Sequence, residues 1–175
     1  MTAGTQHFSI CIAAVLMSAC QSLPPERAGA MADLRPTAGH EATGRVQFTQ
    51  TSEGVQVHAV VTGLQPNREH GFHVHESGDC SAPDAMSAKG HFDPHGRPHG
   101  HIKAATHHAG DMPNLKADAS GRAEVVILLD AVTLQPGAAN ILGRGVIVHA
   151  QPDDYRSQPA GNAGARLACG EIRSR

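Results

Sequence analysis

Residues 44–61 read GRVQFTQTSEGVQVHAVV, and this stretch decides the fold class. Polar and apolar side chains alternate over 44–50 and again over 55–61, and the intervening Ser52-Glu53-Gly54 has the composition of a turn. Successive side chains of a strand point to opposite faces of a sheet. The alternation therefore predicts an antiparallel hairpin with one buried face.

Further strand-like runs follow the hairpin at 71–76, 123–129, 145–149 and 165–172. Residues 77–119 break this pattern with irregular sequence rich in Gly, Pro, His and Asp, and no helical periodicity of any length is present. Strands separated by long irregular excursions are typical of Greek-key proteins. We predict an all-β domain, a Greek-key β-barrel or sandwich of about eight antiparallel strands with long metal-binding and active-site loops.

The composition is compatible with one folded domain and points toward metal. The chain has 175 residues, which is an ordinary size for a single domain. Its formal net charge is −2, so nothing indicates a nucleic-acid partner. Histidine is overrepresented, with 13 residues, most of them between His70 and His108. Because imidazole is the commonest metal ligand in proteins, this bias favours a metal site over a merely polar loop.

Residues 1–19 have the features of a signal peptide. The first twenty residues contain no Asp, Glu, Lys or Arg, and the apolar run over 8–17 is too short to cross a bilayer. Leu16-Met17-Ser18-Ala19-Cys20 resembles a bacterial lipobox. This resemblance predicts cleavage before Cys20 and a lipid on that cysteine, which would hold the protein to a membrane.

The predicted export signal determines how we divide the rest of the chain into segments. We expect residues 20–38 to be the lipid-attachment cysteine and a tether, residues 39–175 to be the folded domain, and the location to be the periplasm or cell envelope. Ala28-Gly29-Ala30 offers an ordinary cleavage site, so soluble export ranks second and cytoplasmic residence third. Outside the cytoplasm, the remaining pair Cys80 and Cys169 is expected to form a disulfide.

The histidines of the strands and of the long loop form two candidate metal sets. His73 and His75 are two residues apart on a predicted strand, so both rings emerge on one face, and His149 ends another strand. Any one of them alone would be an ordinary histidine. The long loop adds three imidazoles and one carboxylate, a closed tetrahedral set suited to structural zinc. These loop residues are His91, His99, His108 and Asp111.

Six sequence blocks together resemble the copper/zinc superoxide dismutases, in that family's order and over about residues 44–172. The blocks are Gly71–Glu76, Gly78–Cys80, Gly90–Pro94, His108–Asp111, Gly143–His149 and Gly161–Gly170. The resemblance implies copper and zinc as cofactors. It implies copper ligands at His73, His75, His91 and His149, and zinc ligands at His91, His99, His108 and Asp111.

The same resemblance assigns roles around the metals. His91 would bridge copper and zinc and act in catalysis, Asp153 would join a copper histidine to a zinc histidine, and Arg166 would be the catalytic active-site arginine beside copper. Cys80 and Cys169 match the family disulfide. The implied reaction converts superoxide to dioxygen and hydrogen peroxide by alternating copper reduction and oxidation, and it would protect the exported compartment.

Departures from the family pattern leave alternatives open. The segment from Asp153 to Asn162 is shorter than the charged steering loop of eukaryotic members, and His95, His101 and His107 are extra. A non-enzymatic metal buffer or copper chaperone on the same fold is a rival reading, and a purely structural zinc protein is a weaker one. A homodimer stays open, because no decisive apolar patch is evident.

Overall fold

The structure, a computed structural model, describes residues 1–2 and 28–175. Cys20 and most of the predicted signal peptide lie outside the described residues. The strands are β1 Gly29–Pro36, β2 Thr43–Thr51, β3 Gly54–Thr62, β4 Glu69–His70, β5 Phe72–His75, β6 Leu115–Lys116, β7 Ala123–Leu129, β8 Gly145–His149, β9 Arg166–Glu171 and β10 Arg173–Ser174. A single 3₁₀ turn, η1, spans Met86–Ala88. No helix within residues 28–175 is long and apolar enough to cross a membrane.

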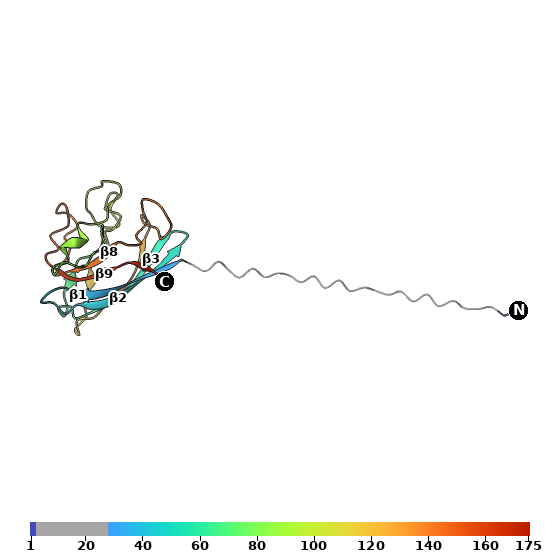
Figure 1. Cartoon of the computed structure of the whole chain (residues 1–175), viewed down its shortest axis with the longest axis horizontal. Helices are drawn as coiled ribbons and strands as arrows, with labels where there is room; N and C mark the ends of the chain where they lie inside the picture. Colours follow the sequence, from blue (N-terminus) through green and yellow to red (C-terminus); the bar gives the residue numbers. More distant parts are fainter. Residues whose placement is uncertain (3–27) are drawn as a thin grey trace.

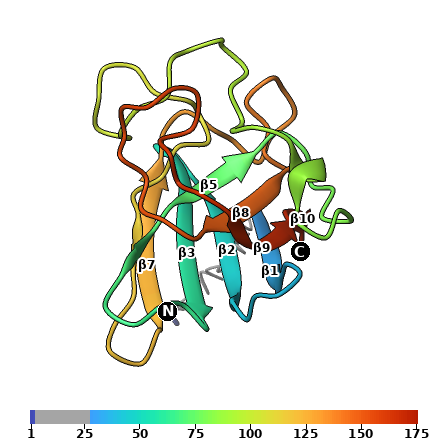
Figure 2. The same ribbon diagram turned by 90° about the vertical axis from the view of Figure 1, so that its left-hand side faces the viewer.

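The main sheet has eight antiparallel strands and curls into two layers. Its order is β5-β8-β9-β1-β2-β3-β7, with β10 paired to β1. Figure 2 shows β1, β2, β3 and β7 side by side, with β5, β8 and β9 crossing in front of them. Strand β1 joins the layers, since Gly29–Leu34 pairs with β2 while Arg35 and Pro36 pair with β9. The predicted all-β antiparallel fold is confirmed.

The predicted hairpin is present and its alternation marks the core. Strands β2 and β3 pair from Thr43↔Thr62 to Thr51↔Gly54. Val46 and Phe48 of β2 are completely buried, as are alternate residues of β3. Their neighbours along each strand are partly or fully exposed. The hydrophobic pattern thus sets the register, because a slip by one residue would turn the buried side chains to solvent.

Residues 29–36 were expected to belong to a tether over residues 20–38, but the structure shows them as a strand. They form β1, in which Ala30, Ala32 and Leu34 are buried in alternation. Residues 29–36 therefore belong to the sheet, ahead of the domain boundary expected at residue 39. Two of the three inward positions are alanines, whose small apolar surface gives a weak strand signal between the flanking prolines.

Two long loops gather at one end of the sheet (Figures 1 and 2). The first comprises residues 76–114, between β5 and β6, and the second comprises residues 150–165, between β8 and β9. His99 in the first loop and Gln158 in the second are joined by two hydrogen bonds of 2.9 Å, one from the His99 amide and one from the Gln158 side chain. The expected disulfide is also present, with Cα atoms of Cys80 and Cys169 5.8 Å apart. It connects the start of the first loop to β9.

Candidate metal centre

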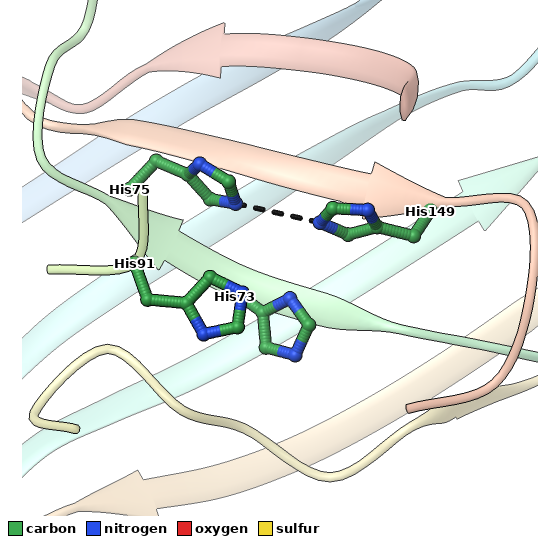
Figure 3. A group of neighbouring side chains, drawn as sticks. All are labelled: His73, His75, His91 and His149. Atoms are coloured by element: carbon green, nitrogen blue, oxygen red, sulfur yellow. Dashed lines mark hydrogen bonds between the residues drawn. The ribbon is translucent and has the colours of Figure 1, made fainter. Parts of the chain in front are cut away.

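Three histidines of the site lie on neighbouring strands: His73 and His75 on β5, and His149 on β8. His73 pairs with Ile147 in the register of these strands, and His149 ends β8. Figure 3 shows His75 and His149 with their rings facing, and their Nε2 atoms are 3.4 Å apart. All three rings are buried, at 5 % exposure or less. The predicted placement of His73 and His75 on one face is as expected from their spacing.

His91 completes this group from the long loop. Its backbone forms an isolated antiparallel bridge with His75. Its ring stacks on His73 with centroids 3.9 Å apart and lies 5.1 Å from the ring of His75 (Figure 3). Candidate ligand atoms of His73, His75, His91 and His149 all lie within 4.8 Å of one another. The four residues for which copper binding was predicted therefore meet in one buried cluster.

Asp111 organises a second group on the other side of His91. Its Oδ1 lies 2.8 Å from His91 Nδ1, 3.0 Å from His99 Nδ1 and 3.5 Å from His108 Nδ1. Its Oδ2 accepts hydrogen bonds from the amides of Gly100 (3.1 Å) and His108 (2.9 Å). The candidate ligand atoms of this set also fall within 4.8 Å of one another. His91 belongs to both groups, which makes it the link between them.

Asp153, which lies in the second long loop, contacts one histidine of each group. Its Oδ2 accepts from His73 Nε2 at 2.8 Å and its Oδ1 from His99 Nε2 at 2.9 Å. Gly161 leaves room for this carboxylate, because a Cβ there would collide with Asp153 Oδ1 and the backbone has a φ of +64°. The predicted contact between a histidine of each group through Asp153 is thus present in the geometry.

Buried nitrogens without hydrogen-bond partners show that the site suits metal ions. His73 Nδ1, His91 Nε2 and His108 Nδ1 are buried and make no hydrogen bond, although His108 Nδ1 lies 3.5 Å from Asp111 Oδ1; outside the site, His70 Nε2 is in the same state. A buried polar atom without a partner is costly, and a metal ion would satisfy these lone pairs. Four imidazoles suit copper, whereas three imidazoles and a carboxylate form a closed set that suits zinc. The residues present therefore fit both ions.

The electrostatics of the site favour the ligand forms of His75, His91, His149 and Asp111. Burial lowers the pKa of His91 to about 4, against the opposing hydrogen bond of Asp111. Burial also holds the pKa values of His75 and His149 well below the usual range, reinforced by neighbouring histidines. Burial opposes ionisation of Asp111, but the imidazoles of His108, His91 and His99 outweigh it and hold that pKa well below its usual range. Neutral imidazoles and a charged carboxylate are what metal binding requires.

The surroundings of the His99 ring stabilise a positive charge. Burial opposes protonation of its ring, yet Asp111 and Asp153 outweigh burial and raise its pKa to about 9. Its two ring nitrogens each face one of these carboxylates, at 3.0 and 2.9 Å. The pocket thus stabilises a cation between two buried carboxylates, which a divalent ion would provide.

Arg166 lies in a cavity beside the four-histidine cluster. The cavity has a volume of about 250 Å³, and His75, His91 and His149 line it together with Met86 and Arg166. The guanidinium is fixed by donating to the carbonyl of Ala85 at 2.6 Å and to that of Lys89 at 2.5 Å. The predicted arginine therefore stands beside the predicted copper ligands in a rigid orientation.

Lys89 has an unusual backbone at this point. Its φ is 63° and its ψ is −149°, a conformation that is essentially restricted to glycine. The Lys89 carbonyl accepts from His75 Nδ1 at 2.9 Å as well as from Arg166. The strained backbone therefore aims one oxygen at both side chains. No sequence signal identified this residue.

The additional histidines of the loop stay outside both metal groups. His107 Nδ1 donates to the His108 carbonyl at 2.7 Å, and the His101 ring packs edge-on against Tyr155 with centroids 4.6 Å apart. His95 is exposed. From the sequence, His70 was expected to be structural or exposed; it is buried, and its Nδ1 donates to the His149 carbonyl at 2.9 Å. It therefore supports the end of β8.

Comparisons with known proteins agree with this geometry. A family model described as copper/zinc superoxide dismutase (SODC) matches residues 42–172. "Superoxide dismutase [Cu-Zn] 2" of Aquifex aeolicus is 46% identical over 148 residues, covering 82% of this chain and 86% of the relative. "Extracellular superoxide dismutase [Cu-Zn]" of Haemonchus contortus is 37% identical, covering 75% of this chain and 74% of the relative. A crystal structure of a SOD-like protein from Bacillus subtilis superposes with a TM-score of 0.74 at 37% identity, covering 81% and 96%.

Fold and site together define an all-β metalloenzyme with two adjoining metal sites. The chain belongs to the copper/zinc superoxide dismutase family. Its cofactors are copper and zinc, and its activity is the oxidoreductase reaction of superoxide dismutation.

Proposed function

We propose that this chain dismutates superoxide with copper held by the four-histidine cluster and zinc held by the second group. Copper would be bound by His73, His75, His91 and His149, and zinc by His91, His99, His108 and Asp111. The observation that carries the proposal is that two buried ligand sets share one imidazole, His91. Copper, when bound, supplies a one-electron cycle that oxidises one superoxide to dioxygen and reduces a second to hydrogen peroxide.

His91 is suited to exchange a proton at the nitrogen that would face copper. Its Nδ1 is engaged by Asp111 at 2.8 Å, whereas its Nε2 is buried without a hydrogen-bond partner. Burial lowers the pKa of the ring to about 4, so at neutral pH Nε2 keeps its lone pair and could hold copper, and Nδ1 would hold zinc. Only when Nε2 is free of copper could His91 take up a proton there and pass it to a basic acceptor.

Arg166 is suited to bind the anionic substrate. Among the described residues that line the cavity, it carries the only formally charged side chain. The carbonyls of Ala85 and Lys89 hold the guanidinium in place, so the charge is oriented before an anion arrives. Such a fixed positive charge would attract superoxide and hold it beside His75, His91 and His149.

Metal analysis combined with a superoxide assay on the mature protein tests this function. We expect one copper and one zinc per chain with turnover well above that of the free metals. A metal buffer or copper chaperone would bind copper without turnover, and a structural zinc protein would bind no copper. A copper-loaded, correctly oxidised sample with no turnover above free-metal background would contradict the proposal.

We also propose that the protein acts in the cell envelope, anchored to a membrane by a lipid on Cys20. The lipobox-like sequence before Cys20 supports this location, as does the similarity to a relative named as extracellular. The position of β1 argues against the alternative cleavage site. Cleavage after Ala30 would remove a buried residue that pairs with both Phe48 and Ser174, whereas cleavage before Cys20 leaves β1 whole.

The anchor is tested by Cys20→Ser in the full chain expressed in a bacterial host. Wild-type protein should incorporate labelled fatty acid and partition into the detergent phase, and Cys20→Ser should do neither. Cys11→Ser is the matched control, because Cys11 lies within the predicted signal peptide and should leave lipid labelling intact. If wild-type protein shows neither lipid label nor detergent partitioning, soluble export replaces the lipoprotein assignment.

A further inference from the structure

The cavity that holds Arg166 offers copper a route to its proposed ligands. His73 is fully buried, and His75 and His149 are exposed by 5 % or less. His75, His91 and His149 line this cavity of about 250 Å³. A copper ion that enters by this route passes the residues at the cavity mouth.

Met86 stands at this mouth and is the only sulfur-bearing residue among the described residues lining it. It is 59% exposed. Its backbone is well fixed, because its amide donates to Asp84 Oδ1 at 3.0 Å and the preceding Ala85 carbonyl accepts from Arg166. The thioether is thus held in solvent on a defined turn, without a place in the core.

A second hollow adjoins the cavity and shares Met86 with it. This outer hollow has a volume of about 330 Å³ and is lined by His40 and Asp84 in addition to Met86 and Arg166. Both His40 and Asp84 are exposed. An imidazole, a carboxylate and a thioether therefore surround the approach, and Met86 lies on the boundary between the outer hollow and the copper cavity.

The side chains at this boundary favour one oxidation state of copper. A thioether is a soft ligand that prefers Cu(I), and it offers little to zinc or to hard cations. Arg166 places a positive charge in both hollows, and it repels a divalent ion more strongly than a monovalent one. The charge of Arg166 opposes the attraction of the Asp84 carboxylate for a divalent ion, so the preference for Cu(I) comes from the neutral sulfur of Met86.

We propose that Met86 is a transient Cu(I)-binding residue at the cavity mouth, through which copper passes to the four histidines. This inference rests on the proposed copper site. No redox step is involved, because the ion moves from the sulfur to imidazole nitrogens in the same oxidation state. Met86 acts in metal acquisition, and it is not a ligand of the resident copper.

Copper uptake by zinc-loaded, copper-free protein tests this role. Copper is supplied as the Cu(I)–bicinchoninate complex, and the loss of its absorbance is followed in time. Met86→Leu keeps the apolar volume but removes the sulfur, and we expect uptake about tenfold slower, as for an entry barrier raised by about 1.4 kcal/mol. The final copper content should equal that of wild type.

Two comparisons make the result specific. Met31→Leu removes a partly buried methionine that lines the hollow beside the disulfide, and its uptake of Cu(I) should match wild type. Uptake of copper supplied as Cu(II)–glycine should be the same for Met86→Leu and wild type, since Cu(II) gains little from a thioether. Equal Cu(I) rates for Met86→Leu and wild type would overturn the inference, and so would equal slowing of Cu(I) and Cu(II), which indicates altered shape alone. Failure of the wild type to bind copper would instead overturn the proposed copper site.

Discussion

His75 and Arg166 share one hydrogen-bond acceptor, the carbonyl oxygen of Lys89. His75 Nδ1 lies 2.9 Å from this oxygen and Arg166 Nη2 lies 2.5 Å from it. A proposed copper ligand and the proposed substrate-binding cation are therefore positioned from the same backbone atom. Their separation is fixed by the main chain and does not depend on a contact between the two side chains.

Arg166→Ala should slow superoxide turnover while both metals stay bound. Loss of one preorganised charged donor costs about 100-fold in turnover, and inhibition by small anions such as azide should weaken. Metal content, measured beside activity, should stay at one copper and one zinc. Arg166→Lys should recover part of the rate, because it restores the charge without the planar fork. Loss of zinc from Arg166→Ala would contradict this assignment.

Asp111→Ala should lose zinc and loosen the loop over residues 77–119. Asp111 supplies the only carboxylate of its group, and it also accepts the amides of Gly100 and His108. Zinc content should fall and hydrogen exchange in the loop should rise. Asp93→Ala is a suitable control, since Asp93 accepts amides of the same loop but belongs to neither metal group. Full zinc with unchanged exchange in Asp111→Ala would show that its role is misassigned.

Asp153→Asn should weaken zinc retention and alter the copper spectrum. The carboxylate accepts from His73 and His99 at once, and an amide can accept with only one of its two terminal atoms. Removal of such an orienting partner costs about 10- to 100-fold in metal affinity. Competition with a zinc chelator measures the change. The neighbouring Asp154→Asn, which contacts no histidine of either group, should retain zinc like wild type.

The double variant Cys80→Ser/Cys169→Ser should be less stable than the oxidised wild type. The disulfide closes a separation of 89 residues, and closure of a loop of that size is worth about 4.6 kcal/mol in the chain-entropy description. Urea denaturation of the zinc-loaded proteins gives the difference. The reduced wild type should unfold at the same urea concentration as the variant. Equal midpoints for the oxidised wild type and the variant would contradict the prediction.

The strands of the core could be predicted because they alternate cleanly. Val46 and Phe48, and the facing residues of β3, follow a two-residue period that no helix would bury on one side. Strand β1 could not be recognised in the same way. Its inward residues include Ala30 and Ala32, which are small enough to fit where β1 crosses between layers but contribute little hydrophobic contrast.

The members of both metal groups could be named from the sequence, although their assembly could not be derived from spacing. His73 and His75 follow from strand geometry, whereas His91, His99 and His108 are distributed over a loop without regular structure. Their grouping was implied by the resemblance to a family, and the structure brings the same residues together. Their roles as ligands remain predictions.

The supporting contacts had no sequence signal. His70 holds the His149 carbonyl, and Gln158 holds both backbone groups of His99. Each contact depends on the direction of a main-chain group that is set only when distant strands and loops have packed. Composition and periodicity carry no information about such directions.

At Lys89 the backbone conformation is constrained, whereas the side chain is not. The side chain is exposed and its charged group pairs with Glu76 at 2.9 Å, so many side chains would serve equally well. The conformation of the residue, in contrast, costs about 1–3 kcal/mol for any side chain bearing a Cβ. Among related sequences, glycine should be freely accepted at this position and β-branched residues should be rare. We therefore expect the torsion angle at this position to be more constrained than the identity of the side chain.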